Sequence, residues 1–248
     1  MKTCQLAAVA AACAVLAACG GNSGGDDTPT PPAGATTYPE VSPVLGQVDT
    51  FATVTTDDAA NAVNRGYEER VTAAGADGSY TLEQDDPSNF TTTINGITYH
   101  YIPTVRTFGP TAGGNVQTGY TETLPSGASK CTQAFHGAHR AVPMWVGETW
   151  SLSYTITCGS TVTNYTDVGA VDAAESVTVP AGTFTALKMH AAISWTTAAG
   201  QNVVEQSTNW VDPAHGFFTL KREVVYQRSG TVPAHFVTGQ TVELQSRH

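Results

Sequence analysis

Residues 187–210 read LKMHAAISWTTAAGQNVVEQSTNW, two runs of alternating apolar and polar residues on either side of a short turn. Leu187, Met189 and Trp195 fall on one face of the first run. A period of two is typical of a strand with one buried face, and the turn at Ala198–Gln201 joins the two runs into a hairpin. We therefore expect an all-β fold whose antiparallel strands follow one another as a meander.

The same alternation recurs along most of the chain. Asn95-Gly96 lies between two such runs and is a strong hairpin signal. Asp57–Arg70 has the composition of a short helix, which Gly66 interrupts. The other strands expected are Val48–Thr55, Tyr67–Ala73, Ser79–Glu83, Thr91–Ile94, Ile97–Thr107, Gly119–Thr123, Trp150–Thr157, Phe218–Tyr226 and Phe236–Leu244.

A faint internal repeat divides the chain beyond residue 37. Pro43–Gln47 and Pro143–Glu148 each open a strand about a hundred residues apart. We expect two similar β units, residues 38–140 and 141–248, although chance explains the likeness about as well.

The first 18 residues have the layout of a bacterial export signal. Lys2 supplies a positive charge, and Leu6–Ala18 is apolar but shorter than the roughly 20 residues that cross a bilayer. Leu16-Ala17-Ala18-Cys19 resembles the lipobox of bacterial lipoproteins. The resemblance implies cleavage before Cys19 and acylation of that cysteine, which anchors the chain to a membrane. Gly20, with no Asp after the cysteine, favours the outer membrane over the inner one.

Residues 19–37 combine the acylated cysteine with a tether rich in Gly, Pro and Thr. The tether has no large apolar side chain, so burial cannot order it. By random-coil scaling it reaches on the order of 20–25 Å. A folded β domain is then expected over residues 38–248.

The charge of the chain excludes one class of partner. The net charge is −10, and removing Lys2 with the signal moves it to −11. A nucleic-acid-binding protein needs a face rich in Lys and Arg, so we expect no nucleic-acid partner. The apolar content of 41% is enough for a sizeable core.

Two cysteines remain after Cys4 and Cys13 leave with the signal and Cys19 is acylated. An exported chain is in an oxidising compartment, which favours a disulfide between Cys131 and Cys158. The alternative is a metal site formed with His136 and His139, but the usual zinc-binding spacings are missing. We expect the disulfide, no metal, and both histidines in a solvated loop.

Three segments carry a second resemblance: VGETWSLSY at 146–154, SVTVPAGTFTALKM at 176–189 and NWVDPAHGFFTL at 209–220. Together, over Pro143–Tyr226, they resemble a group of exported bacterial β proteins, mostly uncharacterised, that are related to half-barrels of the lipoprotein-carrier kind. The resemblance implies a strongly curved meander sheet, half-barrel or barrel-like, around an apolar cavity. It implies no catalytic residues.

Large aromatic residues in this region are candidates for lining such a cavity. In a β domain the same residues more often form a solid core, and the sequence does not separate the two arrangements. The candidate lining residues are Trp150, Phe184, Trp195, Trp210 and Phe218.

No pattern in the chain points to an enzyme. The G-x-S-x-G motif of a serine nucleophile is missing, and the paired carboxylates lack calcium-loop spacing. We expect a non-enzymatic lipoprotein of the cell envelope, without cofactor, that binds a lipid, another apolar ligand or a lipoprotein. The alternative is a structural or protein-interaction module with a solid core.

Overall fold

The computed structural model describes residues 29–87, 91–94, 97–100, 102–111, 114–124, 127–136, 142–230 and 236–248. The export signal, Cys19 and the tether up to residue 28 lie outside the described residues, as do Asn95-Gly96 and His139. No helix in the described part is long and apolar enough to cross a membrane.

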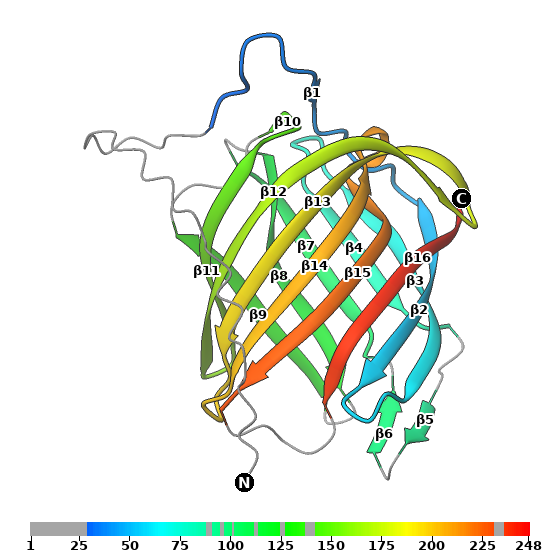
Figure 1. Cartoon of the computed structure of the whole chain (residues 1–248), viewed down its shortest axis with the longest axis vertical. Coiled ribbons are helices and arrows are strands. Elements are labelled where there is room, and N and C mark those ends of the chain that lie inside the picture. The colour runs from blue at the N-terminus through cyan, green and yellow to red at the C-terminus, as the bar shows by residue number, and fades with distance from the viewer. Residues whose placement is uncertain are drawn as a thin grey trace, which may run out of the picture.

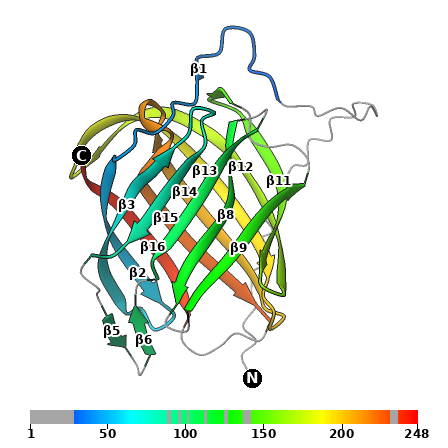
Figure 2. The same ribbon diagram turned by 180° about the vertical axis from the view of Figure 1, so that it is seen from behind.

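Twelve antiparallel strands form a closed barrel (Figures 1 and 2). Their order around the barrel is β11-β12-β13-β14-β15-β16-β2-β3-β4-β7-β8-β9. Strands rich in Val, Thr and aromatic residues suit such a surface, which is buried on one side. The all-β, antiparallel and barrel-like prediction is confirmed. The elements are β1 (Thr37–Tyr38), β2 (Val48–Asp57), β3 (Ala62–Ala74), β4 (Tyr80–Asp85), β5 (Thr91–Ile94), β6 (Ile97–His100), β7 (Thr104–Thr111), β8 (Gly114–Leu124), β9 (Gly127–His136), β10 (Met144–Trp145), β11 (Thr149–Cys158), β12 (Thr161–Val179), β13 (Gly182–Thr196), β14 (Asn202–Asp212), the 3₁₀ turn η1 (Pro213–His215), β15 (Phe218–Ser229) and β16 (Val237–Arg247).

The barrel closes where strands distant in sequence pair. Strand β16 pairs with β2, placing Leu244 opposite Phe51. Strand β9 pairs with β11, placing Cys131 opposite Cys158, and these two cysteines form a disulfide with their Cα atoms 4.3 Å apart. The disulfide therefore fastens the seam between the strands before and after residue 140.

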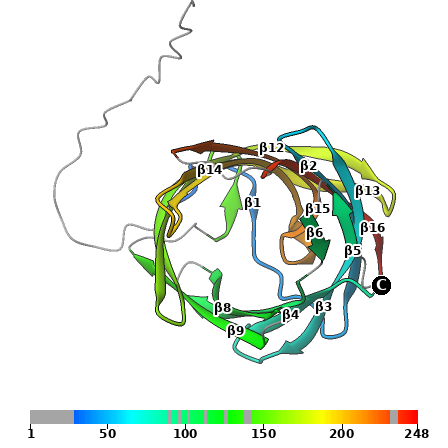
Figure 3. The same ribbon diagram turned by 90° about the horizontal axis from the view of Figure 1, so that it is seen from below.

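One end of the barrel, uppermost in Figure 1, carries additional segments. Strand β1 pairs with β10 there; Met144 belongs to the core cluster that contains Leu187, and Tyr38 packs against that cluster. The long β12–β13 hairpin arches over the same end, and the Ala181 amide donates to the Leu244 carbonyl. Seen from the other end, the strands ring an open centre, with β1 and η1 beyond it (Figure 3).

The two segments that were expected to open repeat units, Pro43–Gln47 and Pro143–Glu148, are built alike. Gly46 and Gly147 both adopt positive φ, 84° and 92°. The Gly46 amide donates to the Val71 carbonyl at 2.9 Å, and the Gly147 amide donates to the Val171 carbonyl at 2.8 Å. A register shift follows each valine. Both halves contribute strands to a single barrel.

Three local expectations differ from the structure. The helix over Asp57–Arg70 is wrong, because strand β3 occupies Ala62–Ala74 and alternate residues there are buried. The single strand expected over Ile97–Thr107 is two strands, β6 and β7. Strand β9 was not expected, and exposed His136 is its last residue rather than part of a loop.

Candidate ligand-binding lumen

Three adjoining pockets occupy the interior of the barrel. The central cavity has a volume of about 530 Å³ and is lined from β3, β4, β7–β15 and the segments at the end of the barrel that carries β1 and β10, which we call the capped end. A second pocket of about 310 Å³ contains Arg65, Arg106 and Arg222, and we call it the arginine pocket. The third, which we call the lower pocket, has a volume of about 570 Å³ and includes Trp195 and Arg228, at the ends of β13 and β15. The central cavity and the arginine pocket share Glu69, Arg106 and Thr219 in their walls.

The central cavity has an apolar and aromatic wall on the side of the capped end. Its members belong to the buried clusters of the core, so they are held in fixed positions by packing. Polar residues also line the cavity, among them Gln117, Gln133 and Asn209. The wall therefore suits a ligand with both apolar and polar parts. The apolar members include Phe108, Phe135, Phe217, Phe218, Leu82, Leu152, Met144 and Met189.

An aromatic ladder crosses four neighbouring strands on the inner face. Phe135 and Tyr154 have ring centroids 5.3 Å apart, and Tyr154 stacks on Tyr165 at 5.0 Å. Tyr165 then contacts Trp195 at 5.5 Å. Such pairs stabilise a sheet beyond the area they bury, and here their faces and edges also form the walls of the central and lower pockets.

Polar contacts hold the guanidinium groups of the arginine pocket. Arg106 Nη2 donates to Gln84 Oε1 at 2.5 Å, and Gln84 Nε2 donates to Glu69 Oε1 at 3.3 Å. Arg106 Nη1 lies 3.9 Å from the Glu69 carboxylate. Arg222 forms an ion pair with Glu205. Among the described residues, the buried Nε of Arg222 has no hydrogen-bond partner.

Burial shifts the pKa of two acids near these arginines. It raises the pKa of Glu69 above 4.5, with Asp49 adding to the effect and Arg106 and Arg222 opposing it. Burial, followed by the charge of Glu205, raises the pKa of Tyr226 to about 12. The Tyr226 hydroxyl therefore keeps its proton at neutral pH, and Glu69 is more easily protonated than an exposed glutamate.

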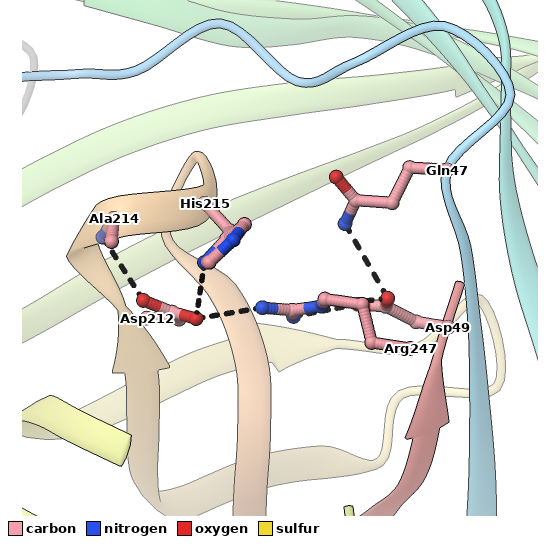
Figure 4. Close-up of polar contacts among 6 residues, drawn as sticks. All are labelled: Gln47, Asp49, Asp212, Ala214, His215 and Arg247. Carbon is pink, nitrogen blue, oxygen red and sulfur yellow. Dashed lines mark hydrogen bonds and ion pairs between the residues drawn. The ribbon is translucent and has the colours of Figure 1, made fainter.

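A separate network of charges holds the capped end (Figure 4). Arg247 donates to both carboxylate oxygens of Asp49, at 2.8 and 2.7 Å, and to Asp212 at 2.6 Å. Asp212 also accepts from the Ala214 amide at 3.0 Å and contacts His215 Nδ1 at 2.7 Å. The network ties β16 to β2 and to the turn after β14. We call it the Arg247 latch.

The five aromatic residues predicted to line a cavity do not lie together. Phe218 lines the central cavity and Trp195 lines the lower pocket. Trp150 is buried in the core and donates to Asp167 at 2.8 Å. Phe184 packs at the capped end, 5.9 Å from the Arg247 guanidinium.

Trp210 faces away from the lumen. It lies opposite Lys188 and Lys221 on the outer surface, with their amines 5.4 and 5.1 Å from its ring. Its indole nitrogen donates to Glu175 at 2.7 Å. Regular strand alternation explains the arrangement, because Asn209 and Val211 both line the central cavity and Trp210 between them therefore points outward.

The prediction from sequence missed the arginines. Arg65 follows Val63 and precedes Tyr67, Glu69 and Val71 at every second position of β3. These positions share the inner face, so charged residues at apolar positions were the available signal. Within the described ranges, no three His, Cys, Asp or Glu side chains are placed to bind a metal ion.

Comparison with known proteins identifies no family for the chain. No family model matches it, and no curated protein matches it. It is similar in structure to a protein of Bacteroides fragilis NCTC 9343 named as exported and YmcC-like in fold, with a TM-score of 0.48 and 12% identity over 86% of this chain and 99% of the other. It is also similar to a protein of Parabacteroides distasonis ATCC 8503 named as a lipoprotein, with a TM-score of 0.41 and 12% identity over 85% and 97%. At this identity and these TM-scores, neither likeness says what this chain binds.

Proposed function

We propose that this chain is a lipid-anchored protein of the bacterial cell envelope that binds an amphipathic ligand inside its barrel, without catalysing a reaction. The lipobox at Leu16–Cys19 supports the anchor, with the outer membrane as its address. The single observation that carries the binding role is the central cavity of about 530 Å³, which lies within the size range of small-molecule sites.

The wall of the cavity favours an amphipathic ligand over a purely apolar one. Phe135, Phe218 and Met189 provide apolar contact, while Gln133 and Asn209 offer amide groups. Gln133 accepts a hydrogen bond from Gln117 and Asn209 donates one to Ser207, both at 3.0 Å. A hydrocarbon without polar groups would displace water from the remaining donor and acceptor positions of these amides, which is costly. A ligand with a polar group at one end satisfies both kinds of wall.

Native mass spectrometry of the full, acylated chain released from detergent micelles tests the proposal. We expect an added mass in the lipid range on the wild type. Thr219→Trp fills the junction of two pockets and should abolish the added mass. Val225→Trp is the matched control, because it lies on the same strand with its side chain 54% exposed on the outside. An empty wild type, even after incubation with total bacterial lipid, would contradict the proposal.

A further inference from the structure

The arginine pocket places concentrated positive charge inside an acidic protein. Ten Lys and Arg residues follow the predicted signal in a chain whose net charge there is −11. Three of them, Arg65, Arg106 and Arg222, line one pocket of about 310 Å³. Glu69 is the only acidic residue in that wall among the described residues. Arg222 has Glu205, which lies outside that wall, as its ion-pair partner.

The single carboxylate of that wall among the described residues is loosely held. Glu69 accepts a hydrogen bond from Gln84 at 3.3 Å, and burial raises the pKa of its carboxyl group. Glu69 also lies 3.9 Å from Arg106, beyond hydrogen-bond distance. The side chains of Arg106 and Arg222 are each 32% exposed, so a ligand in the pocket can reach them. An anion entering this pocket would meet three guanidinium groups and one carboxylate in its wall.

Hydrogen-bonding capacity points the same way. A guanidinium offers five N–H donors. In Arg222, Nη2 donates to Glu205 in an ion pair. Its Nε is buried and has no hydrogen-bond partner among the described residues. Thr53, Thr55 and Gln240 add neutral polar groups to the same wall. The paired N–H donors of a guanidinium group can bind two oxygens of a carboxylate or phosphate at once.

We propose that the arginine pocket binds the anionic group, carboxylate or phosphate, of the ligand, using Arg106 and Arg222. The inference rests on the proposed function. Because the pocket shares Arg106 and Thr219 with the central cavity, a ligand headgroup here leaves its apolar part against the aromatic wall. The ligand class is then an amphipathic anion, such as a fatty acid or a phospholipid with an exposed phosphate.

The first test compares ligands on the wild type, so that no variant has to fold. The full acylated chain in micelles is titrated by native mass spectrometry with oleate, dioleoyl phosphatidate, inorganic phosphate and the neutral oleyl alcohol. We expect oleate or phosphatidate to bind at least about tenfold more tightly than oleyl alcohol, the effect of one charge-assisted contact. Preference for oleate identifies a carboxylate, preference for phosphatidate a lipid phosphate, and binding of inorganic phosphate alone a free anion; each supports an anion site.

The second test removes the arginine together with its partner. The double variant Arg222→Gln/Glu205→Gln leaves no carboxylate without its cation. Its affinity for the anionic lipid should fall about tenfold, while its affinity for oleyl alcohol should change less than about twofold. Comparing each ligand between wild type and variant cancels its partition into micelles. Arg70→Gln is the control, because Arg70 is 54% exposed and pairs only weakly with Glu68 at 3.6 Å.

The outcomes separate the two proposals. Equal affinity for oleate and oleyl alcohol, or equal losses in the double variant, would overturn the anion site and leave the ligand-binding barrel standing. Failure of all four probes to bind would overturn both.

Discussion

The Arg247 latch gives the sharpest prediction for stability. Arg247→Met keeps much of the side-chain volume but removes three hydrogen bonds, two to Asp49 and one to Asp212. The side chains of Asp49 and Asp212 are only 1% and 4% exposed, so both carboxylates lose their cation while buried. Breaking a buried pair in this way costs about 3–5 kcal/mol. For a domain of this size the loss should lower Tm by on the order of 10 °C.

Urea and thermal unfolding of the full chain in micelles, followed by circular dichroism, measure the loss. Arg70→Met is the control and should change stability by less than about 1 kcal/mol, since its ion pair is exposed. Adding Asp49→Asn and Asp212→Asn to Arg247→Met should recover most of the loss, because the cost comes from stranded charge. A loss below about 1 kcal/mol in Arg247→Met, or no recovery in the triple variant, would refute the reasoning.

Three further predictions concern the anchor, the seam and the buried acid. Labelling cells with an alkyne fatty acid should mark the wild type and Cys13→Ser but not Cys19→Ser, and a labelled Cys19→Ser protein would remove the anchor. Cys131→Ala/Cys158→Ala should lower the free energy of unfolding by roughly 3.5 kcal/mol, from a closed loop of 27 residues, and unchanged urea unfolding would contradict this. Because the pKa of Glu69 is raised in the folded state, the wild type loses stability as pH rises through that pKa. Glu69→Gln should therefore be more stable than the wild type in urea unfolding at pH 7.5 and lose this advantage near pH 4.5. An equal gain in stability at both pH values would be inconsistent with a buried acid.

The strands were largely predictable because alternation is a local property. The runs at Trp150–Thr157 and Leu187–Trp195 show it without interruption, and both are strands of the barrel. Strand β9 was not predicted from the sequence. Its outer positions, Lys130, Thr132 and Ala134, do not differ consistently in polarity from its inner ones, so no alternation of apolar and polar residues is visible. The disulfide was predictable by elimination among the five cysteines.

The site was predictable only in part. Phe218 and Trp195 lie in the walls of two pockets of the lumen. Trp210 points outward because it alternates with Asn209 and Val211, which line the cavity, and the sequence does not indicate that polar Asn209 lies on the inner face. The arginine pocket draws its side chains from β3, β7 and β15, and no local pattern reveals that Arg65, Arg106 and Arg222 meet.

The sequence by itself determined the all-β class, the meander order and the disulfide, because each depends on a two-residue period or a residue count. It also predicts the lipid anchor from a short motif. Only the tertiary structure decided that β16 meets β2 and that β9 meets β11, closing the sheet into a barrel. Closure depends on the twist and stagger accumulated over all twelve strands, which no single segment specifies. That same closure turns one face of every strand into the wall of a lumen and brings the arginines together.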